Sequence, residues 1–112
     1  MNIPKQSFYI AVILYKSSSD SEDSPLYEEC FTLIEANSIE EARKRTEDYA
    51  KEAEHSYVGG NGKTIFVSLE RIVDVNNVLD DDLKDGTDIY ARHFRNFAAY
   101  SSFEPLISGE DI

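Results

Sequence analysis

The segment that decides the fold is FYIAVILYK, residues 8–16. Side chains of an extended chain point alternately to opposite faces, and here both faces are apolar. One face carries Phe8, Ile10, Val12 and Leu14, and the other carries Tyr9, Ala11, Ile13 and Tyr15. A strand of this kind is covered on both sides, so we predict that it lies in the middle of a sheet.

The segment that follows is polar and acidic. Residues 17–25 are rich in Ser, Asp and Glu and end in a proline, which predicts a hairpin loop. The next run, residues 26–36, alternates apolar side chains with Glu28, Glu29 and Glu35. Charges of this kind discourage pairing with other chains, so we predict a second strand at the edge of the sheet.

A helix is predicted next, because residues 38–41 are Ser-Ile-Glu-Glu. The Ser38 hydroxyl can accept a hydrogen bond from the Glu41 amide while the Glu41 carboxylate returns to the Ser38 amide, which is a capping box. Small and apolar residues then recur every three or four positions as far as His55, as on a helix that lies with one side on a sheet. The side predicted to face the sheet carries Ile39, Ala42, Thr46, Tyr49 and Ala53.

Two further strands are predicted after the helix. A Gly-Gly-Asn-Gly turn at residues 59–62 leads into an apolar strand at 64–75, where a change of side near Arg71 requires a β-bulge. A second turn, Asp-Gly, then leads into an aromatic strand at about 87–95.

These elements predict a single α+β domain over residues 1–112, with a core at about 8–95 and a tail at 96–112. The element order is β-β-α-β-β. A right-handed crossover through the helix gives an antiparallel sheet of four strands in the order 2-1-3-4, with the helix on one face.

The aromatic C-terminal tail is predicted to pack on an apolar surface. One helix covers only one face of the sheet, so the other face of segment 8–16 stays exposed unless something else covers it. Phe97, Tyr100 and Phe103 recur every three residues, which suits a short helix or an irregular packed tail. The tail either folds back on its own sheet or reaches a second subunit. A two-fold homodimer is favoured, because it buries the patch on both subunits.

The composition is acidic. Asp and Glu total 22 against 11 Lys and Arg, and the formal net charge is −11. This charge repels nucleic acid, whose binding relies on several Lys or Arg contacts. A basic protein partner is easier to accommodate, and the alternative is that the charge only keeps the protein soluble.

Cys30 is the only cysteine, so an internal disulfide is excluded. No cationic neighbour stabilises a thiolate there, and we predict a buried, unreactive thiol. The apolar segment 8–16 is too short to span a bilayer and lacks the features of a signal peptide. We therefore predict a cytoplasmic protein with no membrane partner.

The best candidate binding surface lies on the predicted strand at 87–95. Basic and aromatic side chains are concentrated there in an otherwise acidic chain. The candidate residues are Tyr90, Arg92, His93 and Arg95. In the alternative interpretation the two arginines pair separately with surface acids such as Glu70 or Asp74.

No catalytic, cofactor-binding or metal-ligating residues are predicted. Residues 62–64, Gly-Lys-Thr, resemble the end of a phosphate-binding loop, but a helix precedes them and a strand follows, which is the reverse of that motif. The two histidines lack the spacing of metal ligands. A weak cation site among the acidic residues 80–88 stays open as an alternative to a solvated turn.

We therefore predict a protein-interaction or regulatory module. An acidic inhibitor or immunity-type protein that sequesters a basic partner is one version of it. The alternative is a small enzyme or ligand-binding domain with a pocket near Tyr90 and His93, which would gather a carboxylate such as Glu70.

Four stretches of the chain resemble DUF4288, a bacterial family described only as a domain of unknown function. They are residues 8–12, 33–42, 73–75 and 85–92. The most specific is an Asp-Gly-Thr turn followed by an acidic residue, an aliphatic residue, Tyr90, a small residue and Arg92. The resemblance covers about residues 8–95 and implies a compact α+β domain. It implies no established activity and no catalytic residues.

Overall fold

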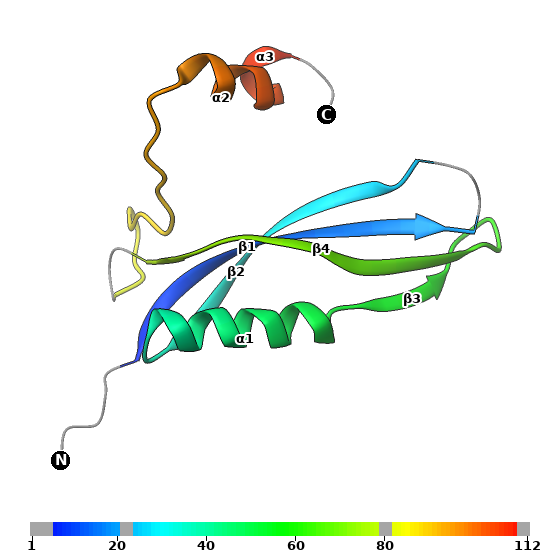
Figure 1. Ribbon diagram of the computed structural model, residues 1–112, viewed down its shortest axis with the longest axis horizontal. Helices are drawn as coiled ribbons and strands as arrows, with labels where there is room; N and C mark the ends of the chain where they lie inside the picture. The colour runs from blue at the N-terminus through cyan, green and yellow to red at the C-terminus, as the bar shows by residue number, and fades with distance from the viewer. Residues whose placement is uncertain (1–5, 21–23, 79–81, 110–112) are drawn as a thin grey trace.

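A computed structural model of the chain describes residues 6–20, 24–78 and 82–109 (Figure 1). The strands are β1 (Ser7–Ser19), β2 (Leu26–Ala36), β3 (His55–Val58) and β4 (Thr64–Asn77). The helices are α1 (Ile39–Glu52), α2 (Phe97–Phe103) and α3 (Pro105–Ser108). No helix in the described part of the chain is long and apolar enough to cross a membrane.

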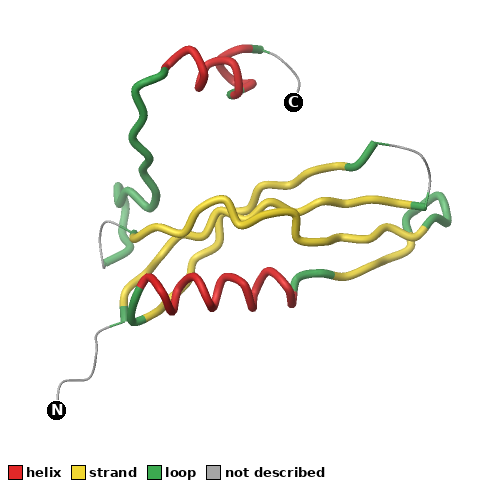
Figure 2. The backbone as a smooth tube through the Cα atoms, viewed as in Figure 1, coloured by secondary structure: helices red, strands yellow, loops and turns green. Residues whose placement is uncertain are grey.

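The four strands form one antiparallel sheet in the order β2-β1-β4-β3 (Figure 2). The prediction of a four-stranded antiparallel sheet in an α+β fold is confirmed. The segment with two apolar faces, β1, pairs with β2 on one side and β4 on the other. Burial on both faces therefore places β1 inside the sheet, as its composition predicts.

The predicted fourth strand at 87–95 is wrong. Residues 88–94 form no strand, and the outer position beside β4 is taken by β3. All four residues of β3 are exposed, so it has no hydrophobic alternation by which it could be recognised. It forms because a short loop joins it to β4: the Gly59 amide bonds the Lys63 carbonyl at 2.8 Å, and Gly62 adopts a positive φ of 79°. Closing so short a loop costs little entropy.

Helix α1 covers one face of the sheet (Figure 1). One of the two predicted capping bonds is confirmed, with the Glu41 amide donating to the Ser38 hydroxyl at 3.1 Å. The Glu41 carboxylate accepts from the Asn37 side-chain amide at 3.2 Å. The residues that α1 buries are four apart: Ala42, Thr46 and Ala50. Tyr49 and Ala53 were predicted to face the sheet, and this is wrong, because both are exposed.

The position of Tyr49 has a local cause. It lies at the flank of the buried stripe, where the Arg45 guanidinium sits 5.7 Å from the centre of its ring. Arg45 Nη2 also donates to the Tyr49 hydroxyl at 3.3 Å. The aromatic ring thus packs against an arginine at the surface, while the smaller Ala50 takes the contact with the sheet.

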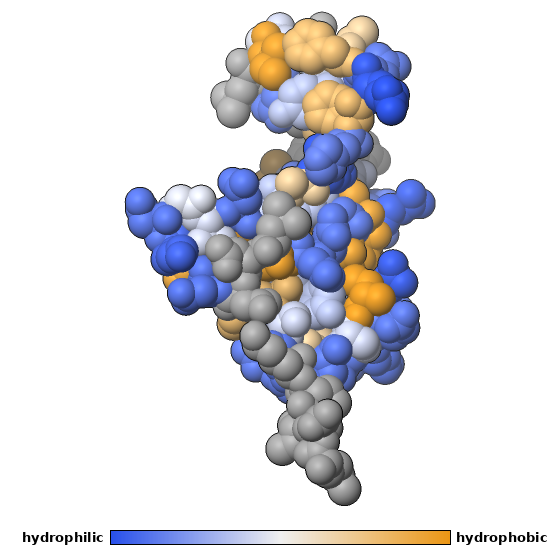
Figure 3. All heavy atoms as spheres, turned by 90° about the vertical axis from the view of Figure 1, so that its left-hand side faces the viewer, coloured by the Kyte–Doolittle hydropathy of each residue, from blue (hydrophilic) through white to orange (hydrophobic). Residues whose placement is uncertain are grey.

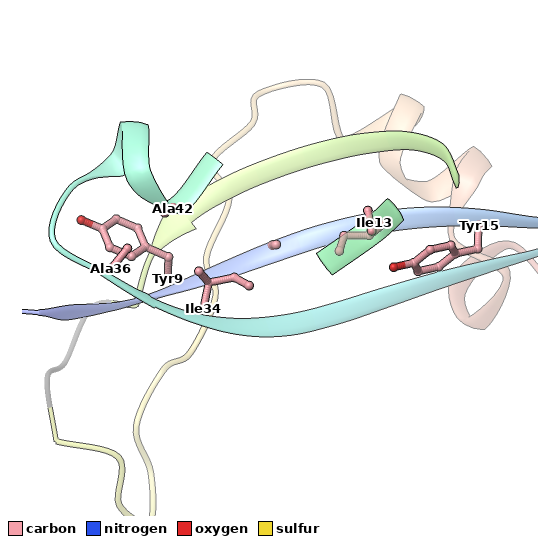
Figure 4. Close-up of a cluster of buried hydrophobic side chains, with 8 residues drawn as sticks. Tyr9, Ile13, Tyr15, Ile34, Ala36 and Ala42 are labelled. Carbon is pink, nitrogen blue, oxygen red and sulfur yellow. The ribbon is translucent and has the colours of Figure 1, made fainter. Parts of the chain in front are cut away.

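The main core lies between α1 and the sheet (Figure 4). It is built from alternate residues of β1 and from the end of β2. Its buried members are Tyr9, Ala11, Ile13, Tyr15, Ile34, Ala36, Ala42 and Ala50. Ile13 is fully buried and sits at the centre of the sheet, since it pairs with both Cys30 and Ile72.

Strand β4 contains two β-bulges, where one bulge was predicted near Arg71. The register against β1 shifts between Val12 and Ile13 and again between Leu14 and Tyr15. Val73 and Glu70 are the extra residues, because neither has a partner on β1. The bulges allow β4 to change side without leaving the ladder.

The face of the sheet turned away from α1 is called the open face here. It has a small core of its own, in which Ile10, Val12 and Val78 are buried and Phe8 and Tyr90 pack against them. Toward β2 this cover stops. Phe31 and Leu33 pair with Val12 and Ile10, so they share the open face, yet 57% and 45% of their surfaces remain exposed.

Candidate functional site

The chain returns to the open face at Tyr90. The Tyr90 hydroxyl donates to Asp74 Oδ2 at 2.8 Å, and its ring lies 5.9 Å from that of Phe31. Upstream, the turn at residues 82–87 is closed by Thr87, whose amide bonds the Lys84 carbonyl at 3.0 Å and whose hydroxyl accepts from the Lys84 amide at 3.1 Å. These contacts explain why the segment forms no strand. Its side chains hold it against one face of the sheet, so its backbone does not pair with a strand at the edge of the sheet.

Tyr90 belongs to a polar cluster with Asp74 and Arg92. Burial raises the pKa of the Tyr90 phenol, and the hydrogen bond to Asp74 and the charge of that carboxylate raise it further. The Arg92 guanidinium acts on the same phenol in the opposite direction and lowers its pKa. The net rise extends to higher pH the range in which the protonated phenol can donate to Asp74.

Beyond Tyr90 the chain leaves the sheet. We call residues 91–109 the C-terminal arm; they contain a connecting segment, α2 and α3. The arm stands on the side of the sheet opposite α1 (Figure 1) and forms a separate lobe (Figure 3). Asn96 caps α2 by accepting from the Ala99 amide at 3.1 Å, and the rings of Phe94 and Tyr100 stack with centres 4.8 Å apart.

A pocket of about 600 Å³ lies between the arm and the end of β4. Its lining residues are Asn76, Ala91, Arg92, His93, Phe94, Asn96, Ala99, Tyr100 and Phe103. The lining combines aromatic rings with one guanidinium, one imidazole and two amides. Such a set can stack on a planar group and donate hydrogen bonds to an anion.

The structure divides the predicted binding surface. Tyr90 lies on the sheet, Arg92 links it to the pocket, and His93 lines the pocket. Arg95 is exposed and is not part of the pocket lining. Glu70, the carboxylate given as an example for the enzyme alternative, does not line this pocket either.

The predicted self-association residues lie on α2. None of the residues of α2 is buried, and 65% of Phe97 and 61% of Phe103 is exposed, while Tyr100 stacks on Phe94. A second exposed apolar surface, which was not among the predicted site residues, is formed by Phe31 and Leu33 on β2. Phe31 and Leu33 lie two residues apart between Glu29 and Glu35, and this spacing signals a face of the edge strand that carries both apolar and acidic side chains.

The Cys30 thiol is partly buried, where full burial was predicted. It donates to Glu28 Oε1 at 3.0 Å, two residues away on the same strand. This hydrogen bond is the main cause that raises the pKa of Cys30, to about 11, and burial and the Glu28 charge add to it. The thiolate is the nucleophilic form, so the geometry makes this thiol slow to react.

We expect Glu28→Gln to speed alkylation of Cys30. The change removes the charged acceptor, which lowers the pKa of the thiol toward its ordinary value and raises the thiolate fraction near pH 8 by about tenfold or more. Alkylation of the native protein by iodoacetamide, followed by mass spectrometry, measures the rate. Glu29→Gln is the matched control on the opposite face and should leave the rate unchanged. Equal rates for both variants and the wild type would contradict this role of Glu28.

The structure describes only part of the acidic turn at residues 80–88. Asp80 and Asp81 of the candidate cation site lie outside the described residues. Within the part of the chain that is described, no group of three or more His, Cys, Asp or Glu is placed to hold a metal ion.

Fold and site together define a small α+β domain with one covered and one partly open sheet face, and with an aromatic arm at its C-terminal end. The chain belongs to the DUF4288 family, a domain of unknown function whose model matches residues 8–91. The match ends at Ala91, where the arm begins. Comparisons with curated proteins and with solved structures found no match.

Proposed function

We propose that this domain is a protein-interaction module whose binding surface is the open face at β2. The observation that supports it is the exposure of Phe31 and Leu33 beside a buried apolar patch on the same face. Monomeric proteins rarely leave a contiguous apolar surface of this kind uncovered, and such patches mark sites of association.

The charge around this patch favours a basic partner. Glu29 and Glu35 flank Phe31 and Leu33 at every second position of β2, so all four side chains share the open face. The whole chain carries a net charge of −11. We propose a partner segment that combines aromatic or aliphatic side chains with Lys or Arg, as an inhibitor or immunity-type protein would sequester. The single thiol of Cys30 fits a reducing compartment, and the proposal includes a cytoplasmic location.

Binding of a small ligand is the second candidate. The observation that favours it is the pocket of about 600 Å³, where Arg92 and His93 lie beside the rings of Phe94 and Tyr100. This combination fits a planar anion such as an aromatic carboxylate. Arg92→Gln should abolish binding of such a ligand and leave binding of a basic protein unchanged, which separates the two candidates.

The interaction proposal is tested by purification of partners from cell extract at low and high salt, followed by calorimetry with the purified partner. Glu29→Lys/Glu35→Lys should weaken binding by about tenfold or more, since it reverses charge at the contact. Glu40→Lys/Glu47→Lys changes the net charge by the same amount at exposed positions of α1, and it should weaken binding far less. Equal losses in both double variants, or binding that resists high salt, would contradict a specific acidic face.

A further inference from the structure

We infer that the C-terminal arm docks on the open face of a second copy of this chain, so that two subunits exchange arms. The inference rests on the proposed function, because it assigns an occupant to the same open face. It is carried by two observations: the extended shape of the chain and the exposed apolar side of the arm.

The shape is too open for a compact monomer. The accessible surface is 8565 Å² and the radius of gyration is 17.5 Å. A compact monomer of 12.7 kDa exposes about 6,200 Å² and has a radius of about 13 Å. The excess of about 2,400 Å² exceeds the area of about 800 Å² that each subunit buries in an interface of standard size.

The arm exposes an apolar side. Among the described helices and strands α2 lies chiefly against α3, and none of the residues of α2 is buried. A helix of seven residues is not stable by itself in water, so its apolar side needs a surface to cover it. Phe97 and Phe103 offer that side, and the view in Figure 3 shows hydrophobic side chains gathered on the lobe.

The course of the connecting segment favours a second copy over the arm's own sheet. Tyr90 fixes the chain on its own open face, and residues 91–96 then lead away from the sheet without returning to it (Figure 2). In a two-fold dimer the open face of the second copy would bind this arm, and the arm of the second copy would bind the open face of the first. Both apolar surfaces are then covered in both subunits.

Light scattering on the full chain at micromolar concentration tests the inference. We expect a dimer of twice the 12.7 kDa chain mass. Two double variants should each give a monomer: Phe97→Ser/Phe103→Ser removes the arm's apolar side, and Phe31→Ser/Leu33→Ser removes the face. Because these side chains are exposed, both variants should keep the circular dichroism spectrum of the wild type. Tyr57→Ser is the control, since Tyr57 is 48% exposed on the other face of the sheet.

A mixture of the two double variants distinguishes exchange from an arm that folds on its own sheet. The Phe31→Ser/Leu33→Ser variant keeps an intact arm, and the Phe97→Ser/Phe103→Ser variant keeps an intact open face. The arm of the first can dock on the face of the second, so the mixture should form a heterodimer with one arm bound. A wild-type monomer, or double variants that stay monomeric when mixed, would overturn the inference.

Salt separates this inference from the interaction proposal. The dimer is held by apolar contacts between two acidic chains, so it should persist at about 1 M salt, where charges are screened beyond about 3 Å. A basic partner should be lost under the same conditions. If the protein is a monomer that still binds a basic protein through Glu29 and Glu35, arm exchange is ruled out and the interaction proposal stands. If it is a salt-resistant dimer that binds no basic protein, the basic partner is ruled out and arm exchange stands.

Discussion

Ile13→Ala should lower the free energy of unfolding by about 3 kcal/mol, as typical for truncation of a fully buried aliphatic side chain. Ile13 has no exposed surface, and it is flanked by strands on both sides and covered by α1 on its own face. The surroundings are therefore unable to collapse into the space that the missing carbons leave. Denaturant unfolding followed by circular dichroism measures the change.

Leu26→Ala is the matched control for this prediction. Leu26 begins β2 and is 73% exposed, so its truncation removes little buried area and should cost less than about 0.5 kcal/mol. If the two variants lost similar stability, the main core would not lie where the structure puts it.

Tyr90→Ala should release the arm and the turn that precedes it from the sheet. The change removes the ring that packs on Phe31 and the hydroxyl that bonds Asp74, which together should cost about 2 kcal/mol of local stability. Proteolytic cleavage within residues 82–96 should then become at least about tenfold faster, since cleavage follows the population of the open form. Tyr57→Ala should leave the cleavage rate as it is.

Tyr90→Phe separates the ring from the hydroxyl and carries a pH dependence. The raised pKa of Tyr90 means that its contribution to stability is complete below about pH 10, the value for an unfolded tyrosine, and is lost as the pH rises through the folded value. Burial raises the pKa of Tyr15 as well, so the wild type should lose stability above about pH 10 through both residues. Tyr90→Phe should lose less over that range. An unchanged slope would mean that the Asp74 bond is absent in solution.

The parts of the fold that the sequence predicts are those in which local pattern and tertiary burial agree. Two apolar faces predict the central position of β1, and the Ser38 cap predicts the start of α1, because each signal is contained within a few residues. The strand β3 escapes prediction because its residues are exposed and only its hairpin with β4 defines it. The segment at 87–95 has residues typical of strands, but the hydrogen bond from Tyr90 to Asp74 holds it against the open face of the sheet.

The candidate site was predictable in its residue types and not in its geometry. The concentration of aromatic and basic residues from Tyr90 to Arg95 is visible in the sequence, and part of it does line the pocket. Asn76 joins the pocket from the end of β4, and no spacing along the chain signals this contact. The exposure of Phe31 depends on where the arm goes, which is a property of the whole chain.

The two bulges in β4 make the length of this strand adjustable. Eleven residues of β1 from Tyr9 to Ser19 pair with thirteen residues of β4 from Ile65 to Asn77, and Val73 and Glu70 account for the difference. Deletion of either bulge residue leaves every other side chain of β4 on its present face, whereas deletion of any paired residue inverts the strand beyond it. Insertions and deletions among relatives of this chain should therefore concentrate at these two positions, and a sequence alignment that ignores them would place half of β4 out of frame.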